Sequence, residues 1–249
     1  MESWPYAEVS SSNPRRKLGL ISEKLTVHIS RRNGFSTCNL FYQRELENTG
    51  VAIHLNMPVT PELVKDKGPD AVIIATGAVP YSTEIEGVEE AHVVTAWQVL
   101  QGKANIGARA VIADWRCDWV GLGLAERLAR DGCHVRLAVN GMVAGQTIPQ
   151  YARDVWLGTL HKLGVEIIPH VRLFGIDAED AYFQHTLSGE PVVLDAVDTL
   201  VTALGHTPHT ELEQALNELG VPHHVIGDSL SPRTAEEAIL EGLKVGAML

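Results

Sequence analysis

The chain has 249 residues, of which 45% are hydrophobic and 20% charged, and its formal net charge is −11. This composition is ordinary for a globular protein with a sizeable core. The sequence contains no run of about 18 apolar residues, the length that a membrane-spanning helix requires. The acidic balance excludes the basic surface that nonspecific nucleic-acid binding requires. Residues 1–12 lack the pattern of a secretion signal, so we expect a cytoplasmic protein without nucleic-acid or membrane partners.

The cysteines and histidines do not predict a bound metal. The three cysteines are widely spaced and form no Cys-x-x-Cys pair, which argues against a disulfide framework and against an iron–sulfur cluster held by this chain alone. The best metal-like spacing joins His206 and His209, near the pair His223 and His224. Because no cysteine or carboxylate stands at ligand spacing beside them, we interpret these histidines as loop residues and expect no metal site.

The amino-terminal part is the least readable. Residues 18–29 alternate weakly between apolar and polar and are compatible with a strand or a helix, and no strand-turn-helix unit is clear before residue 41. A short strand over 51–55 and a helical turn from Pro61 follow. Ala71–Ala75 is then a continuous apolar run that ends at Thr76-Gly77. Such a run is typical of a strand that is buried on both faces of a parallel sheet.

A second unit begins near residue 106. The pattern predicts strands over 110–113, 135–139 and 165–168, which alternate with helices over 121–130 and 150–163. This order is the signature of a doubly wound sheet. Three short β-like pieces follow, over 171–176, 181–186 and 191–194, and predict a small antiparallel sheet with a turn at Ser188-Gly189.

The last part of the chain returns to the first unit. A buried strand is expected over 199–204, a helix over 211–219, a short strand over 224–226 and a final helix over 234–248. The predicted fold is therefore α/β, with two interleaved Rossmann-like, three-layer nucleotide-binding domains, the second inserted in the first. We expect an incomplete FAD-like domain from 1–104 and 195–249, and an inserted NAD(P)-like domain from 105–194.

Several motifs carry a family resemblance. Residues 71–80 (AVIIATGAVP) resemble the ATG motif of flavoproteins with two dinucleotide domains, and Val225-Ile226-Gly227-Asp228 resembles their late GD motif. Residues 231–238 (SPRTAEEA) and 114–126 resemble the tail of the trimethylamine dehydrogenase, dienoyl-CoA reductase and N-methylproline demethylase group. In that group an Old Yellow Enzyme-like barrel precedes the nucleotide domains. The resemblance covers about residues 41–249.

The resemblance implies a site for FAD or ADP. Asp228 would face the ribityl or phosphate part of a flavin, and Thr76 and Gly77 would lie beside its adenosine end. Gly227 would let the backbone approach the ligand, and the helix start at Arg233 and Thr234 would offer N–H groups to a phosphate. The alternatives are that Asp228 is a helix-capping residue and that Thr76-Gly77 is an ordinary turn. We therefore predict six cofactor-binding residues: Thr76, Gly77, Gly227, Asp228, Arg233 and Thr234.

Two departures from the family pattern matter. The sequence shows no barrel, so FMN and an iron–sulfur cluster are expected only on a partner chain. It also shows no opening strand with G-x-G-x-x-G, the loop that holds a cofactor pyrophosphate at a helix start. The expected partner is a barrel-bearing flavoenzyme subunit or a chain that supplies the missing loop.

The inserted unit has a weak dinucleotide signature. Gly121 and Gly123 have the required spacing, but Glu126 takes the third position and the glycines come seven residues after Asp114. The second strand ends at Asn140-Gly141, without an acidic residue for a ribose or an arginine for a 2′-phosphate. We expect NAD(P)H binding to be weakened or lost.

The loop before this helix holds two tryptophans, Trp115 and Trp119. They are candidates to dock a partner, but folding onto their own domain is the favoured interpretation.

Two hypotheses on function follow. The first is a nucleotide-binding component of a flavin-dependent oxidoreductase that takes part in electron transfer and demethylates amines or N-methyl amino acids together with a separate barrel chain. The alternative is a non-catalytic scaffold or subunit-contact module with a degenerate nucleotide fold. No Ser-His-Asp or Cys-His arrangement is evident, so the sequence predicts no catalytic residue.

Overall fold

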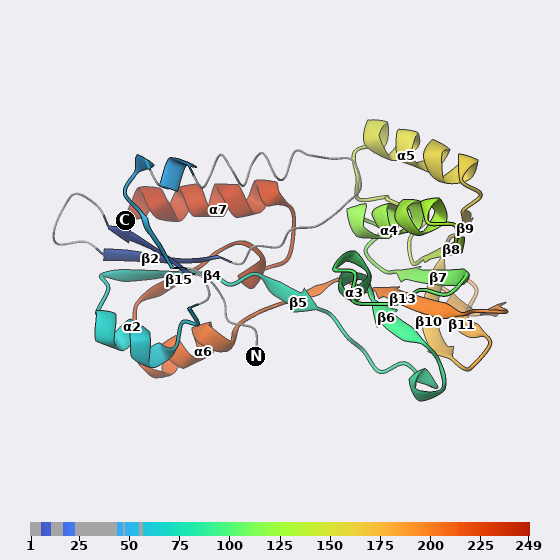
Figure 1. The fold of residues 1–249 in the computed structure, drawn as a ribbon, viewed down its shortest axis with the longest axis horizontal. Coiled ribbons are helices and arrows are strands. Elements are labelled where there is room, and N and C mark those ends of the chain that lie inside the picture. The colour runs from blue at the N-terminus through green and yellow to red at the C-terminus, as the bar shows by residue number, and fades with distance from the viewer. Residues whose placement is uncertain (1–5, 11–16, 23–43, 47, 55–56) are drawn as a thin grey trace. The chain divides into compact units, whose positions relative to one another are not determined.

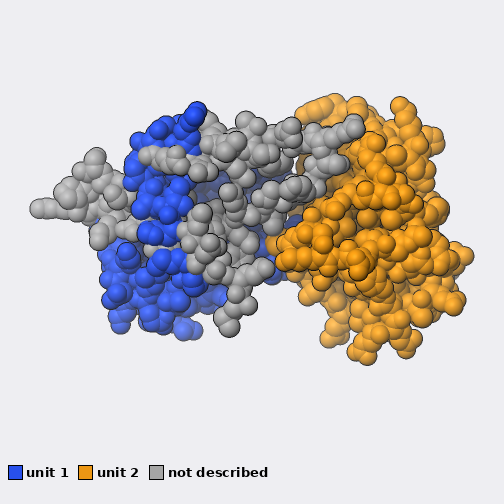
Figure 2. All heavy atoms as spheres, in the orientation of Figure 1, with its two compact units in different colours: residues 1–26, 32–79, 206–249 blue, residues 27–31, 80–205 orange. Residues whose placement is uncertain are grey.

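The structure is a computed structural model that describes residues 6–10, 17–22, 44–46, 48–54 and 57–249. The chain divides into two compact units. Unit 1 comprises residues 1–26, 32–79 and 206–249, and unit 2 comprises residues 27–31 and 80–205 (Figure 2). The chain therefore leaves unit 1, forms most of unit 2 and returns to complete unit 1.

Unit 1 is built on a five-stranded sheet with the order β15–β4–β2–β1–β3 (Figure 1). Its strands are β1 (Tyr6–Ser10), β2 (Lys17–Ser22), β3 (Ala52–His54), β4 (Ala71–Ala75) and β15 (His223–Val225). β4 pairs in parallel with β15 and β2, whereas β1 runs antiparallel to β2 and β3. The predicted strand at 71–75 is confirmed with the bounds that its apolar run indicates.

Helices cover both faces of this sheet. The helices are α2 (Pro61–Lys67), α6 (Glu211–Glu218) and α7 (Ala235–Met248). Successive side chains of a strand point to opposite faces, so Val72 and Ile74 of β4 pack with Leu216 of α6. Ile73, on the other face, packs with Val245 of α7. This alternation explains why every position from 71 to 74 is buried and why the run is continuously apolar.

Unit 2 is built on a five-stranded parallel sheet with the order β6–β13–β7–β8–β9. Its strands are β6 (Val93–Thr95), β7 (Arg109–Asp114), β8 (His134–Val139), β9 (Glu166–Ile168) and β13 (Thr199–Ala203). On one face, Ala110 and Ile112 belong to a core shared with α3 (Ala96–Leu100), α4 (Trp119–Arg130) and α5 (Gln150–Lys162). On the other face, Val111 and Ala113 pack against a second sheet.

The second sheet of unit 2 is antiparallel. It consists of β10 (Val171–Ile176), β11 (Ala181–His185) and β12 (Pro191–Leu194) in that order. The sequence-based prediction of three small antiparallel strands is therefore confirmed. A further two-stranded sheet pairs β5 (Ala78–Pro80) with β14 (His206–Pro208). The chain passes from unit 1 to unit 2 in β5 and returns to unit 1 at the start of β14.

The boundaries of the two units differ from the expected domain boundaries. The sequence pattern places residues 80–104 and 195–205 in the outer domain, but the structure groups them with the inserted unit. The reason is that β13 lies between β6 and β7 and pairs in parallel with both strands. An apolar run identifies a buried strand such as β13, but it does not identify that strand's neighbours in the sheet.

Candidate functional site

In unit 1, the ends of β4 and β15 lie at one edge of the sheet. Val225 pairs with Ile74, so the Thr76-Gly77 turn and the Gly227-Asp228 turn leave neighbouring parallel strands at their carboxyl ends. Ser229 reinforces this arrangement, because its Oγ donates a hydrogen bond to the Ile74 carbonyl at 3.0 Å. The carboxyl edge of a parallel sheet is where ligands bind in doubly wound folds. The structure thus brings together two pairs of residues that the sequence separates by about 150 positions.

The Thr76-Gly77 turn is fixed by the backbone of His209. Thr76 is buried, and its Oγ1 donates to the His209 carbonyl at 2.9 Å, while the His209 N–H donates to the Gly77 carbonyl at 3.1 Å. Gly77 has a φ of 78°, and a side chain there would meet nothing within 4 Å. A cavity of about 210 Å³ borders Thr76 and is lined also by Pro61, Leu212 and His209. Glycine allows the left-handed backbone conformation of this turn, and the space that a side chain would occupy here is open.

The Gly227-Asp228 turn is held by groups of this chain. The Gly227 N–H donates to the Glu241 carboxylate on α7 at 2.7 Å. One oxygen of Asp228 accepts a hydrogen bond from the Arg233 backbone N–H at 3.2 Å. The backbone donor that the motif would offer to a ligand is therefore engaged by an internal carboxylate, and Asp228 acts at least in part as a turn-capping residue.

The start of α7 is also stabilised internally. Thr234 is the N-cap and forms a capping box with Glu237. Its hydroxyl lowers the pKa of the Glu237 carboxyl, with a further contribution from the backbone N–H groups of Glu237 and Thr234. The Arg233 guanidinium pairs with Glu241 and donates to the Ser231 carbonyl. The side chains of Arg233 and Thr234 thus have structural partners, and their predicted contact with a cofactor stays a prediction.

These residues fit a dinucleotide only in part. In a doubly wound unit the central strand delivers the glycine-rich loop that binds the pyrophosphate. Here the strand beside β4 is β2, with Leu20 opposite Ile73, and the sequence from residue 23 to residue 33 contains no glycine. The open turn at Gly77 suits the approach of a ligand, but the described residues supply no pyrophosphate cradle. They do not form a complete FAD site.

Unit 2 has a carboxylate where a dinucleotide fold binds phosphate. Asp114 ends β7 and is fully buried. Its Oδ1 accepts hydrogen bonds from the backbone N–H groups of Cys117 at 2.8 Å and Arg116 at 3.0 Å. A Cβ at Gly121 would lie 2.1 Å from Asp114 Oδ2. Gly121 is therefore needed for the approach of Asp114 to α4, a role that its spacing with Gly123 does not reveal.

Burial raises the pKa of Asp114 from 3.8 to about 7, with a smaller contribution from the nearby Asp118 carboxylate. The hydrogen bonds from Cys117 and Arg116 oppose this rise. Asp118 caps α4, because it accepts a hydrogen bond from the Val120 N–H at 2.9 Å. Asp118 thus uses an N–H group at the helix start that would otherwise attract an anion, and Asp114 uses two N–H groups of the loop before it.

Cys117 lies in the same turn but is not an activated thiol. It is buried and has a φ of 50°. Burial, followed by the negative charge of the nearby Asp114 carboxylate, raises the pKa of its thiol to about 11. Since the thiolate is the reactive form, the residue is inert at neutral pH.

The space beside the turn after β8 is also occupied by a side chain of this chain. A Cβ at Gly141 would lie 2.3 Å from Gln146 Oε1, and this oxygen accepts a hydrogen bond from the Met142 N–H at 3.0 Å. The Asn140 N–H donates to the Asp114 carbonyl at 3.0 Å. Gln146 therefore fills the space beside Asn140-Gly141, where a dinucleotide fold would receive the ribose.

The two tryptophans of this region pack onto unit 2. The Trp119 ring lies 5.6 Å from the Trp156 ring. The Trp115 ring lies 6.2 Å from the Tyr81 ring, and the Arg172 guanidinium stands 4.5 Å above it. The interpretation that these tryptophans fold onto their own domain is confirmed.

Sequence reasoning missed Glu241 and the structural role of Asp114. Glu241 stands fourteen residues after Gly227, and no local pattern links the two.

Within the residues that the structure describes, no three His, Cys, Asp or Glu side chains are grouped closely enough to hold a metal ion. The helices found there also lack the length and apolar character of a membrane-spanning segment.

Comparison with known protein families identifies the family of this chain. Residues 62–227 match the family described as pyridine nucleotide-disulphide oxidoreductase. The chain belongs to this family. The match extends from α2 of unit 1 through unit 2 to the Gly227 turn, so it includes both the β4 end and the β15 end. The family comprises flavin-dependent oxidoreductases that bind FAD.

Relatives of the chain fall in the flavoenzyme group that the motifs indicate. A "Probable N-methylproline demethylase" of Rhizobium meliloti is 26% identical over 256 residues, which cover 89% of this chain and 37% of the relative. An N,N-dimethylglycine/sarcosine dehydrogenase of Chromohalobacter salexigens is 27% identical over 143 residues, which cover 53% of this chain and 21% of the relative. The chain thus spans well under half the length of these relatives.

Solved structures show the same fold. A 2-naphthoyl-CoA reductase complex superimposes with a TM-score of 0.76 at 24% identity and covers 86% of this chain and 32% of that chain. Histamine dehydrogenase from Rhizobium sp. 4-9 gives a TM-score of 0.76 at 18% identity and covers 92% of this chain and 39% of that chain. The predicted α/β, Rossmann-like fold class is confirmed.

Proposed function

We propose that this chain is the nucleotide-binding component of a flavin-dependent oxidoreductase that demethylates an amine or an N-methyl amino acid. The observation that carries the proposal is the edge of unit 1, where the β4 and β15 ends lie together and each is followed by a glycine with positive φ, Gly77 and Gly227. The kinship with a demethylase and a dehydrogenase of methylated amino acids supports the substrate class.

In this proposal unit 1 is the FAD-like domain. Thr76 and Gly77 border the adenosine end of FAD or ADP, and Gly227, Asp228, Arg233 and Thr234 lie beside the ribityl or phosphate part. FAD, when bound, supplies two-electron redox chemistry. The chain's own residues shape the binding edge: Thr76 and Ser229 attach the two turns to the backbone of unit 1. The missing pyrophosphate donors come from a glycine-rich loop on a partner chain or on another part of a longer protein.

The proposed partner bears the barrel, with FMN and an iron–sulfur cluster, and carries out the chemistry on the substrate. Unit 2 is an NAD(P)-like domain that does not bind NAD(P)H. Asp118 supports this assignment, because its carboxylate accepts from an N–H group at the start of α4 and repels a phosphate there. Asp114 occupies the N–H groups of Arg116 and Cys117 in the preceding loop.

A non-catalytic scaffold is the second candidate, and one observation favours it. Both sites where a phosphate would meet backbone N–H groups are filled by internal carboxylates, Glu241 in unit 1 and Asp114 in unit 2. Such sites stabilise the fold without a ligand. A scaffold would keep the same stability with and without any nucleotide.

The experiment is an absorbance spectrum of the purified chain, alone and after co-expression with the products of adjacent reading frames, with mass spectrometry of any released cofactor. The proposal predicts flavin absorbance in the complex and a rise in melting temperature on addition of FAD or ADP. A colourless complex with no thermal response to either nucleotide contradicts the proposal and favours the scaffold.

A further inference from the structure

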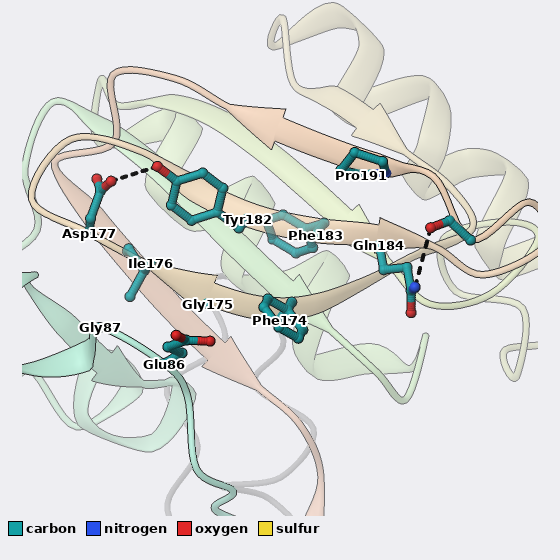
Figure 3. A pocket seen from close by; sticks show the side chains of 11 residues that line it. Glu86, Gly87, Phe174, Gly175, Ile176, Asp177, Tyr182, Phe183, Gln184 and Pro191 are labelled. Carbon is teal, nitrogen blue, oxygen red and sulfur yellow. Dashed lines mark hydrogen bonds between the residues drawn. The ribbon is translucent and has the colours of Figure 1, made fainter.

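The outward face of the sheet β10–β11–β12 in unit 2 carries a cavity of about 550 Å³ (Figure 3). This volume lies within the range of small-molecule sites, roughly 300 to 1,000 Å³. None of the residues that line it belongs to the predicted nucleotide-binding set. The cavity therefore needs an explanation apart from the proposed function.

Two glycines build one wall of the cavity. The Ile176 N–H donates to the Glu86 carbonyl at 2.8 Å, and Glu86 pairs with Gly175 as an isolated parallel bridge. A Cβ at Gly87, whose φ is 79°, would lie 1.8 Å from the Ile176 carbonyl oxygen, and a Cβ at Gly175 would lie 3.1 Å from the Glu86 carbonyl oxygen. Position 87 therefore requires glycine, and a side chain at position 175 would be tightly packed against Glu86. This close approach holds Glu86 beside Phe174 (Figure 3).

Aromatic side chains form much of the remaining wall. Phe174 is 65% exposed, because the alternation of β10 places it on the outward face of the strand, as it does Arg172. Tyr182 lies on the same outward face of β11, and its hydroxyl donates to Asp177 Oδ2 at 2.6 Å. Together the two rings give the cavity an aromatic lining. The faces of aromatic rings attract cations.

The charged groups of the cavity are both acidic. Glu86 and Asp177 line it, and the lining includes no lysine or arginine. The Tyr182 hydroxyl, followed by the backbone N–H groups of Glu179 and Asp180, lowers the pKa of the Asp177 carboxyl, so this group is ionised at neutral pH. A ligand that complements two carboxylates and two aromatic side chains is a cation with an apolar body.

We propose that this cavity binds an organic cation, an ammonium group carried on an aromatic or branched apolar body. Glu86 faces the charge, and Phe174 and Tyr182 contact the apolar part. The site is independent of nucleotide binding in unit 1, so either proposal can fail without the other.

The test is calorimetric titration of the full chain with benzyltrimethylammonium chloride. Benzyl alcohol serves as the neutral probe, benzenesulfonate as the anionic probe and tetralysine as a cation without an aromatic body. We expect saturable binding of the quaternary ammonium probe, at least about tenfold weaker binding of benzyl alcohol and none of benzenesulfonate. Equal binding of all probes, tetralysine included, or no binding of the ammonium probe would overturn the proposal.

Substitutions of two exposed residues test whether the probe binds in this cavity. Glu86→Gln and Phe174→Ser should each weaken binding of the ammonium probe about fivefold to tenfold. Glu218→Gln on α6 removes the same charge in unit 1, and Leu187→Ser removes an exposed apolar side chain, 75% exposed, on the hairpin after β11. These two controls should bind like the wild type. Urea midpoints verify that all four variants are folded, and unchanged affinity in the first pair would overturn the assignment.

Discussion

The carboxylate of Glu241 accepts a hydrogen bond from the backbone N–H of Gly227 at 2.7 Å. This contact places a negative charge at the β15 end, where the family motif would offer a donor to a cofactor. The same carboxylate pairs with the Arg233 guanidinium. The residue thus stabilises the turn and at the same time opposes an incoming phosphate.

Glu241→Gln should strengthen the binding of ADP to the full chain by at least about threefold. The amide oxygen of glutamine still accepts the hydrogen bond from Gly227, but the charge that repels a phosphate is gone. Loss of the pair with Arg233 should cost less than about 1 kcal/mol of stability, because the Arg233 side chain is 41% exposed and solvent screens the pair. The measurement is calorimetric titration with ADP. Glu236→Gln, an exposed change of equal charge on the same helix, is the control, and a gain shared by both variants would refute the specific role.

Asp114→Asn should remove a pH dependence of stability. Because the pKa of Asp114 is about 7 in the folded chain and 3.8 ordinarily, the folded state holds a proton that the unfolded state releases. The associated stability is present below about pH 4, declines as the pH rises and is lost above about pH 7. At about 1.4 kcal/mol per pKa unit, the change is on the order of 4 kcal/mol.

Urea unfolding of the wild type and Asp114→Asn at pH 5 and pH 8 measures this effect. Asparagine still accepts the hydrogen bonds from Cys117 and Arg116, so the variant should be folded. The wild type should lose more stability than the variant between the two pH values. Identical pH profiles would show that Asp114 is ionised throughout.

Gly121→Ala should destabilise unit 2 by about 2 to 3 kcal/mol, because the added Cβ would lie 2.1 Å from Asp114 Oδ2. The control is Gly158→Ala in α5, where a Cβ meets nothing within 4 Å. That change should stabilise the helix by up to about 1 kcal/mol. In an Asp114→Ala background the cost of Gly121→Ala should shrink, which a double-mutant cycle detects. Additive effects would contradict the proposed contact.

The strand ends could be predicted from the sequence, but their surroundings could not. The apolar run Ala71–Ala75 predicts a strand buried on both faces, and alternate packing of Val72 and Ile73 against helices on opposite sides explains why. By contrast, β2 pairs with β4 without an informative apolar pattern. The side of the sheet that a strand joins depends on pairing between distant segments, and the apolar run of β13 does not show that it pairs with β6 and β7.

The carboxylates at the candidate sites illustrate a second limit. The spacing of Gly121 and Gly123 predicts a weakened phosphate loop, but the glycine at 121 serves the buried side chain of Asp114. Glu241 lies on α7, fourteen residues after the Gly227 that it contacts, and its helical surroundings give no sign of this role. Contacts of this kind depend on tertiary packing, which a single sequence does not encode in any local period.

The most direct test of the account is the response of backbone amide resonances of the full chain to ADP and, separately, to NADH. The account predicts that millimolar ADP shifts the resonances of Gly77, Gly227 and Asp228 in unit 1. It predicts no change at Arg116, Cys117 or Gly121 of unit 2 on addition of NADH. Unit 1 resonances that ignore ADP, or unit 2 resonances at the start of α4 that shift with NADH, would contradict it.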